Sequence, residues 1–167
     1  HVNDFHMGIS NDLCSEKYGV SREDQDRYAA ESYRRTIAAI ESGRFAAEIA
    51  PVAVPQRKGE PKIFDTDECP RDTSYEALAK MKPAFQKEGF ATAGNASIIS
   101  DGAAAVVVMA RKRAEALGCD ILATLGAQAS FGIDMKYVLV APVWAIPKCL
   151  DKAGIDKADV DLWEVNE

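Results

Sequence analysis

Gly102-Ala-Ala-Ala-Val-Val-Val-Met109 is the segment that most clearly indicates a fold class. None of its side chains is polar, so the segment has no face that prefers water. A strand that is apolar on both faces belongs to a sheet covered on both sides. The run is also far shorter than the roughly 20 apolar residues that a membrane-spanning helix needs. We therefore interpret it as a buried strand and expect no membrane insertion.

The chain that follows alternates between helical and extended patterns. We expect a helix over Arg111–Leu117 that ends at Gly118, and a second over Val143–Ala153 that ends at Gly154. Extended patterns separate and follow these helices, and the predicted strands are Ile121–Ala129 and Val160–Val165. This alternation predicts an α/β fold in which helices cover a sheet.

The chain before residue 100 has a different character, because it is rich in helix and loop patterns. Ser21-Arg-Glu-Asp24 resembles a capping box that opens a helix, and Gly43 is placed to end that helix. Beyond it we expect an extended segment at Pro51–Pro55, turns over Pro61–Thr73, a short helix at Tyr75–Met81 and a loop at Gly89–Asp101.

Charge and composition exclude some classes of function. The net charge of -6 argues against a general nucleic-acid-binding protein, which needs a basic face to displace counterions. Two local clusters of basic residues are expected to be solvated surface charge by default. They are Arg57, Lys58 and Lys62, and Lys80, Lys82 and Lys87.

The cysteines favour neither a metal site nor a local nucleophile. The 4 cysteines form no CxxC pair, and the chain has only 2 histidines, so metal-ligand spacing is absent. No secretory signal precedes them, so we expect reduced thiols in an intracellular compartment. No His is near enough in the sequence to activate Cys119 or Cys149.

The two ends of the sequence predict a chain that is truncated. Position 1 is His rather than an initiator Met, and the last expected strand stops at Asn166-Glu167. In open α/β sheets functional groups gather just beyond the carboxyl ends of the strands. The sequence stops at that point.

Several segments, in this order and at these spacings, resemble the thiolase family across essentially the whole chain. Two of them, His6-Met-Gly8 and Trp163-Glu-Val-Asn-Glu167, resemble the acetoacetyl-CoA, or biosynthetic, branch. The others are Ser21-Arg-Glu-Asp-Gln-Asp26, Gly43-Arg-Phe45, Lys80-Met-Lys-Pro-Ala-Phe85, Thr92-Ala-Gly-Asn-Ala-Ser97, Asp101-Gly-Ala-Ala-Ala105 and Ala141-Pro-Val143.

The resemblance implies a thiolase-like fold, with a layered α/β/α/β/α core in the whole enzyme. It implies that residues 1–99 are a loop domain covering the coenzyme A (CoA) site, that 100–119 end the N-terminal half, and that 120–167 begin a truncated C-terminal half. It also implies a homo-oligomer, dimer or tetramer, in the cytoplasm or the mitochondrion.

The activity implied by the resemblance is that of an acetyl-CoA C-acetyltransferase. Such an enzyme joins two acetyl-CoA molecules to acetoacetyl-CoA plus CoA, or runs this Claisen condensation backwards as thiolysis. By resemblance, the nucleophilic Cys, the acid/base Cys and the activating His all lie outside this sequence, so the chain alone is expected to be inactive. CoA is a substrate, and no cofactor is expected.

Three alternatives stay open at this point. The first is a degradative 3-ketoacyl-CoA thiolase. The second is a non-catalytic thiolase-like subunit that binds acyl-CoA or supports assembly. The third is an unrelated α/β interaction domain, against which the ordered series of motifs argues.

The resemblance also assigns candidate site residues. Asn166 matches an Asn that holds a water in an oxyanion hole, a role suited to an amide NH₂ donor. The other matched positions are assigned to CoA binding, and without the resemblance Phe85 would be ordinary core and Ser97 an ordinary turn. These positions are His6, Met7, Arg71, Phe85, Ala93 and Ser97.

Overall fold

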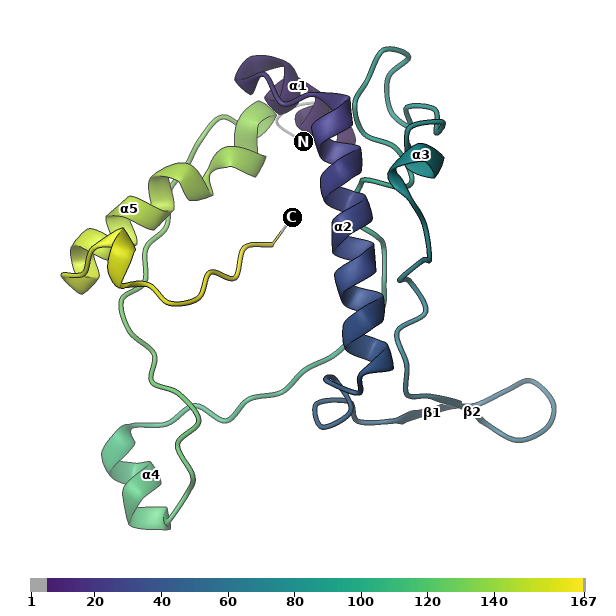
Figure 1. The fold of residues 1–167 in the computed structure, drawn as a ribbon. Coiled ribbons are helices and arrows are strands. Elements are labelled where there is room, and N and C mark those ends of the chain that lie inside the picture. Colours follow the sequence, from purple (N-terminus) through teal and green to yellow (C-terminus); the bar gives the residue numbers. More distant parts are fainter. Residues whose placement is uncertain (1–5, 167) are drawn as a thin grey trace. The chain divides into compact units, whose positions relative to one another are not determined.

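The computed structural model describes residues 6–166 and divides the chain into two compact units (Figure 1). The boundary falls between Ile98 and Ile99. Each unit is described by itself below.

The first unit opens with a helix that the sequence did not predict, α1, over Met7–Tyr18. His6 is its N-cap, and Gly19 ends it in the left-handed conformation with φ 68°. Its buried positions are small or polar, so the helix lacks the apolar face by which helices are usually recognised. They are Gly8, Ser10, Asp12, Cys14 and Ser15.

Helix α2, Arg22–Glu41, confirms the helix predicted from the capping pattern. The Ser21 hydroxyl oxygen accepts from the backbone N–H of Asp24 at 3.0 Å and so caps the first turn. At the other end Gly43 adopts φ 70°, its N–H donates to the Ile40 carbonyl, and the next N–H, of Arg44, donates to Ala39. This Schellman arrangement satisfies carbonyls that the helix end leaves without partners.

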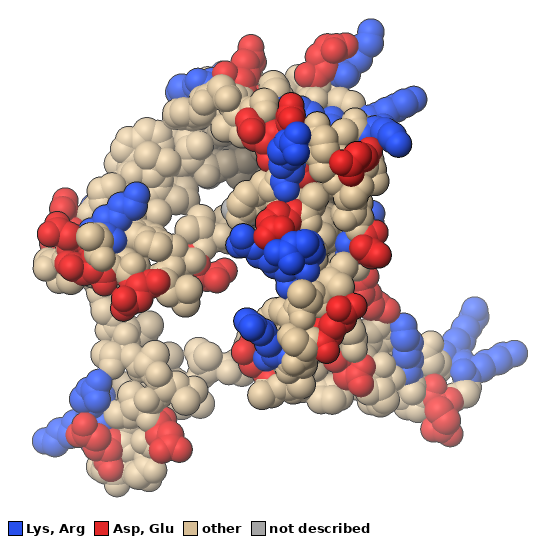
Figure 2. All heavy atoms as spheres, viewed as in Figure 1, with Lys and Arg blue, Asp and Glu red and all other residues tan. Residues whose placement is uncertain are grey.

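The exposed side of α2 carries charges of both signs. Figure 2 shows Lys and Arg intermingled with Asp and Glu on this part of the first unit. Glu31 accepts hydrogen bonds from Arg34 and Arg35, which lowers the pKa of its carboxyl to about 2. Neither positive nor negative charge dominates this face.

A short antiparallel hairpin follows, formed by β1, Val52–Val54, and β2, Lys62–Phe64. Val52 pairs with Phe64, and Val54 pairs with Lys62. The expected extended segment at 51–55 is therefore confirmed. The segment 61–73 was expected to be mostly turns, and the structure adds β2 to it, because three residues are enough to pair with a neighbouring strand.

Helix α3 spans Tyr75–Leu78 and brings the largest buried side chain of the unit, Leu78, into a small core with Ala91. This helix is shorter than the predicted 75–81. Gly94 lies so close to this core that a Cβ there would stand 2.5 Å from Leu78 Cδ2 and 2.7 Å from Met81 Sδ. The loop therefore packs tightly on α3 because residue 94 is glycine.

In the second unit both predicted helices are present. They are α4, Arg111–Leu117, and α5, Pro142–Ala153, and each ends at a left-handed glycine, Gly118 or Gly154. Short 3₁₀ helices occupy Met135–Val140 (η1) and Lys157–Asp159 (η2).

Helix α5 contacts the segment before it, mainly through polar groups. Cys149 Sγ donates to the Ala127 carbonyl at 3.2 Å, and Lys152 Nζ donates to the Gln128 carbonyl at 3.0 Å. The rings of Phe131 and Trp144 stack at 5.7 Å. Residues 127–131 thus contact α5 but form no strand.

The strands predicted in the second unit are not formed. The segments 102–109, 121–129 and 160–165 have no ladder partners, and within residues 6–166 the β1–β2 hairpin is the only sheet. Val106 and Val107 are 85% and 87% exposed, the reverse of the expected burial. A strand needs neighbours for its backbone groups, and an apolar pattern alone cannot supply them.

Candidate functional site

The first two candidate residues lie where α1 begins. The Nδ1 atom of His6 accepts from the Gly8 N–H at 3.1 Å, which fixes the imidazole at the helix end. The ring then stacks on Phe85, with centroids 4.6 Å apart and planes 16° apart. Gly8 makes this possible, because a Cβ at that position would collide with the Phe85 ring.

Asp12, one turn further along α1, fixes the segment that carries Phe85. Its carboxylate accepts from the N–H groups of Phe90 at 2.7 Å and Ala91 at 3.0 Å, and from the Gln86 amide at 3.1 Å. Asp12 is only 4% exposed, so these bonds are sheltered from water. The N–H of Ala84 donates to the Ala91 carbonyl at 2.8 Å, which folds the segment back beside Phe85.

The loop over residues 92–97 is held by its own side chains. Asn95 Oδ1 accepts from the Thr92 N–H at 2.7 Å, and Thr92 Oγ1 accepts from the N–H groups of Gly94 and Asn95. The Ala96 N–H donates to the Thr92 carbonyl at 3.1 Å. Thr92 is fully buried, whereas Ala93 and Ser97 are exposed.

These contacts gather most of the candidate residues on the first unit. His6 and Phe85 touch, and Met7 beside them is 46% exposed. Ala93 and Ser97 lie on the loop that begins directly after the Ala91 anchor. The five candidate residues of the first unit, His6, Met7, Phe85, Ala93 and Ser97, are together called the candidate surface below.

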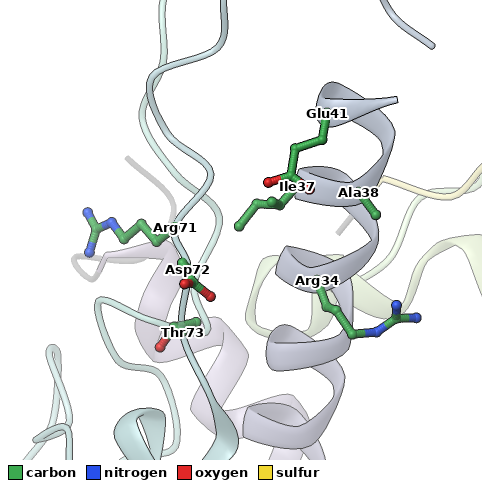
Figure 3. A pocket seen from close by; sticks show the side chains of 7 residues that line it. All are labelled: Arg34, Ile37, Ala38, Glu41, Arg71, Asp72 and Thr73. Carbon is green, nitrogen blue, oxygen red and sulfur yellow. The ribbon is translucent and has the colours of Figure 1, made fainter. Parts of the chain in front are cut away.

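Arg71 belongs to a different feature, an open depression of about 360 Å³ between α2 and the segment 71–73. Figure 3 shows Ile37 and Glu41 of α2 turned toward that segment, while the guanidinium of Arg71 points away from the helix. The remaining lining residues are Arg34, Ala38, Asp72 and Thr73. The structure does not join Arg71 to the stacked pair of His6 and Phe85.

Asn166 belongs to the second unit, where it is exposed in a segment without regular structure. Its predicted catalytic role rests on the motif Trp163-Glu-Val-Asn166 alone.

The described residues hold no group of three or more His, Cys, Asp or Glu placed to bind a metal ion. Over the same range, no helix is both long and apolar enough to cross a membrane. Among the cysteines Cys14 is buried, Cys119 is exposed, and Cys69 and Cys149 are half-buried.

The sequence reasoning missed four residues that organise this region: Asp12, Arg22, Asp26 and Asn95. Their partners lie 56 to 79 positions away in the chain, so local patterns do not reveal them. One signal was available, since Arg22 and Asp26 are at i, i+4 on a predicted helix and so can pair. The burial of that pair could not be foreseen.

Comparison with known families gives a clear assignment. Residues 1–112 match the family described as "Thiolase, N-terminal domain", and residues 119–167 match "Thiolase, C-terminal domain". The chain belongs to the thiolase family. The resemblance inferred from the sequence motifs is thereby confirmed, and the unrelated interaction domain is excluded.

Individual relatives of this thiolase chain extend along nearly all of it. It is 55% identical over 166 residues to an acetyl-CoA acetyltransferase of Pseudomonas aeruginosa, and 51% identical to one of Allochromatium vinosum. In both cases the match covers 99% of this chain and 42% of the relative. The chain thus spans less than half the length of the curated relatives that it matches.

A solved structure supports the same fold. The acetyl-CoA acetyltransferase from Syntrophomonas wolfei matches with a TM-score of 0.90 and 39% sequence identity, over 99% of this chain and 42% of that one. The thiolase-like α/β fold predicted from the motifs is therefore confirmed for this chain.

Proposed function

We propose that this thiolase chain is the CoA-binding part of an acetyl-CoA C-acetyltransferase. The whole enzyme would condense two acetyl-CoA molecules to acetoacetyl-CoA and CoA, and catalyse the reverse thiolysis. The 55% identity to the Pseudomonas aeruginosa enzyme is the observation that carries this proposal.

The candidate surface has the chemistry that the pantetheine arm of CoA requires. The stacked rings of His6 and Phe85 offer a flat apolar face, and Ala93 has too little side chain to block close approach. The Ser97 hydroxyl can donate to or accept from an amide. This mixture of apolar contacts with few polar groups is typical of small-molecule sites.

The proposal also assigns a role to each segment of the chain. Residues 1–99 would form the loop domain that covers the CoA site, 100–119 would complete the N-terminal half, and 120–167 would begin the C-terminal half. Asn166 would hold the oxyanion-hole water. Arg71 would contact the adenine or phosphate end of CoA, for which its forked donors are suited.

The covalent chemistry would come from residues that have no counterpart in this sequence. None of the 4 cysteines lies in a motif that resembles the thiolase nucleophile or its acid/base Cys. The role of this chain would be to bind and orient the thioester, and orientation alone can lower a barrier substantially. No cofactor is proposed, because CoA serves as substrate.

A chimaera tests the proposal: residues 1–167 replace the aligned segment of the Pseudomonas aeruginosa relative. Thiolysis is followed by the loss of acetoacetyl-CoA absorbance. The chimaera is expected to turn over, while the 167-residue chain alone is not. Ser97→Ala in the chimaera is expected to raise KM for CoA about tenfold, as loss of one hydrogen bond predicts, with kcat nearly unchanged.

Ser100→Ala is the matched control, since Ser100 is an exposed serine three residues further on and outside the candidate surface. It is expected to leave KM unchanged. A chimaera that folds with the parental Tm but has no thiolysis activity would overturn the proposed function. Preference for long-chain 3-ketoacyl-CoA over acetoacetyl-CoA would instead favour the degradative branch.

Assembly and location complete the proposal. The whole enzyme would act as a homo-oligomer inside the cell, because both features accompany the thiolase resemblance. The named relatives come from bacteria, and they give no support to the mitochondrial alternative.

A further inference from the structure

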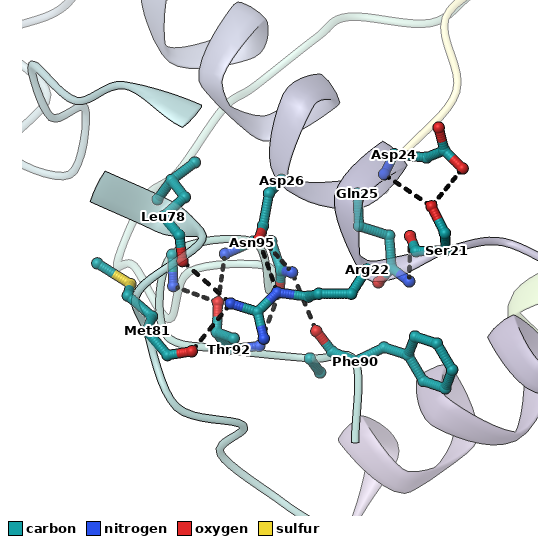
Figure 4. A network of polar contacts seen from close by, with 12 residues as sticks. Ser21, Arg22, Asp24, Gln25, Asp26, Leu78, Met81, Phe90, Thr92 and Asn95 are labelled. Carbon is teal, nitrogen blue, oxygen red and sulfur yellow. Dashed lines mark hydrogen bonds and ion pairs between the residues drawn. The ribbon is translucent and has the colours of Figure 1, made fainter. Parts of the chain in front are cut away.

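The Asp26 carboxylate on α2 is buried and yet has a partner for each oxygen. Asp26 is 1% exposed. Its Oδ2 accepts from Arg22 Nε at 2.7 Å, and its Oδ1 accepts from the Asn95 side-chain amide at 2.9 Å. Figure 4 shows the carboxylate between the guanidinium and the amide. A buried charge is costly unless it is paired in this way.

Asn95 carries this contact into the loop that bears Ala93 and Ser97. Its amide nitrogen donates to Asp26 and also to the Phe90 carbonyl at 3.1 Å, while its oxygen accepts from the Thr92 N–H. One side chain therefore joins α2 to both ends of the turn at residues 90–95. Ser97 follows two residues later.

Arg22 completes the network on the opposite side. Its Nη2 donates to the carbonyls of Leu78 at 3.0 Å and Met81 at 2.9 Å, at the end of α3. These are the residues whose side chains a Cβ at Gly94 would strike. The loop is thus hydrogen-bonded to α2 through Asn95 and Asp26, and its Gly94 lies close to Leu78 and Met81, whose carbonyls Arg22 binds from α2.

We propose that Asp26 and Asn95 are positioning residues for CoA: they hold the loop so that Ser97 meets the ligand, without touching the ligand themselves. This inference rests on the proposed function, in which Ser97 contacts CoA. A loop already fixed in its binding conformation loses little freedom when the ligand arrives. Once the link is broken, the loop must be ordered at the moment of binding, which weakens affinity.

Isothermal titration of the chimaera with CoA tests the inference through a double-mutant cycle. Asn95→Ala is expected to weaken CoA binding about tenfold when Ser97 is present, and about twofold when Ser97→Ala is already in place, since residues that act together are not additive. A purely structural role of Asn95 predicts equal losses in both backgrounds.

Two further variants keep the test decisive. Asn95→Asp retains the acceptor for the Thr92 N–H but faces Asp26 with an acceptor instead of a donor, so it breaks the link at unchanged volume; it is expected to weaken binding in the same direction. Ser21→Ala removes the N-cap hydroxyl of α2, whose partners are the backbone N–H and the carboxylate of Asp24, and is expected to lower Tm without changing CoA affinity.

The outcomes separate the two proposals. If Ser97→Ala leaves CoA affinity unchanged, the proposed CoA contact fails. If Ser97→Ala weakens binding while the Asn95 variants bind as the parent does, or lose the same factor in both backgrounds, only the positioning role is overturned. Non-additive losses, with Ser21→Ala binding normally, support it.

Discussion

Glycine at position 8 is required by a neighbouring ring rather than by backbone conformation. Its backbone is helical, but the Phe85 ring occupies the place where a side chain would begin. The stack of His6 on Phe85 therefore depends on a residue that takes no part in it.

Gly8→Ala is expected to push the Phe85 ring aside and to destabilise the chimaera by about 1–3 kcal/mol, the usual cost of overpacking. KM for CoA should rise at the same time, because the ring belongs to the candidate surface. Thermal unfolding and thiolysis kinetics measure the two effects. Gly132→Ala is the control, since a Cβ there meets no atom within 4 Å; equal behaviour of both variants would contradict the argument.

Helix α2 contains one carboxyl group, that of Glu31, with a strongly lowered pKa. Because Arg34 and Arg35 both donate to Glu31, the pKa of this carboxyl is lowered from 4.5 to about 2. A folded-state pKa below the unfolded value adds stability above pH 4.5, and this stability is lost as the pH falls toward 2. Since the group is solvent-exposed, the contribution to folding is small.

An NMR titration of the 167-residue chain is expected to show the Glu31 carboxyl changing protonation near pH 2 rather than near 4.5. Replacing both arginines, with Arg34→Gln and Arg35→Gln, should return the midpoint to the ordinary range, because the donors are gone. A midpoint that stays low in that double variant would show that another cause is at work.

The elements also show which parts of the fold a sequence can predict. The ends of α2, α4 and α5 followed from Ser21, Gly43, Gly118 and Gly154, because caps and left-handed glycines act within a few residues. Helix α1 was not predicted, because its buried side chains are small or polar and give the sequence no apolar helical pattern. The strands expected after residue 100 are absent. A strand forms only when a second segment pairs with its backbone, and an apolar pattern within one segment does not show whether such a partner is present.

The candidate site divides in the same way. Motif resemblance named residues that would meet a ligand, such as the half-buried Phe85 and the exposed Ser97. It did not name Asp12 or Asp26, which hold them in place, because those contacts span 69 to 79 residues. Their detection required the folded chain.

The molecule as a whole combines a first unit with satisfied buried groups and a second unit with an apolar segment left in solvent. Asp12, Asp26 and Thr92 are buried and hydrogen-bonded, whereas Val106 and Val107 are almost fully exposed. Monomeric proteins rarely expose apolar patches of this kind without a partner.

Hydrogen exchange is expected to distinguish the chain alone from the chimaera. In the chain alone, the amides of residues 103–109 should exchange as in an unfolded peptide, because they lack ladder partners. In the chimaera they should be protected by about a thousandfold or more, as core strands usually are. Amides in the middle of α2 serve as the control and should be protected in both. Protection of 103–109 in the chain alone would contradict the structure.

The cap of α1 has a chemical consequence for whatever approaches it. Since His6 Nδ1 is occupied as an acceptor by the Gly8 N–H, the proton of the neutral imidazole resides on Nε2. The ring thus presents an N–H on its other edge, and it can offer a hydrogen bond there but cannot receive one. A carbonyl oxygen near Nε2 could accept this hydrogen bond. A donor group such as an amide N–H could not bond to the ring, because neither ring nitrogen can accept from it. The helix cap therefore makes His6 a hydrogen-bond donor, and not an acceptor, toward a thioester bound at the candidate surface.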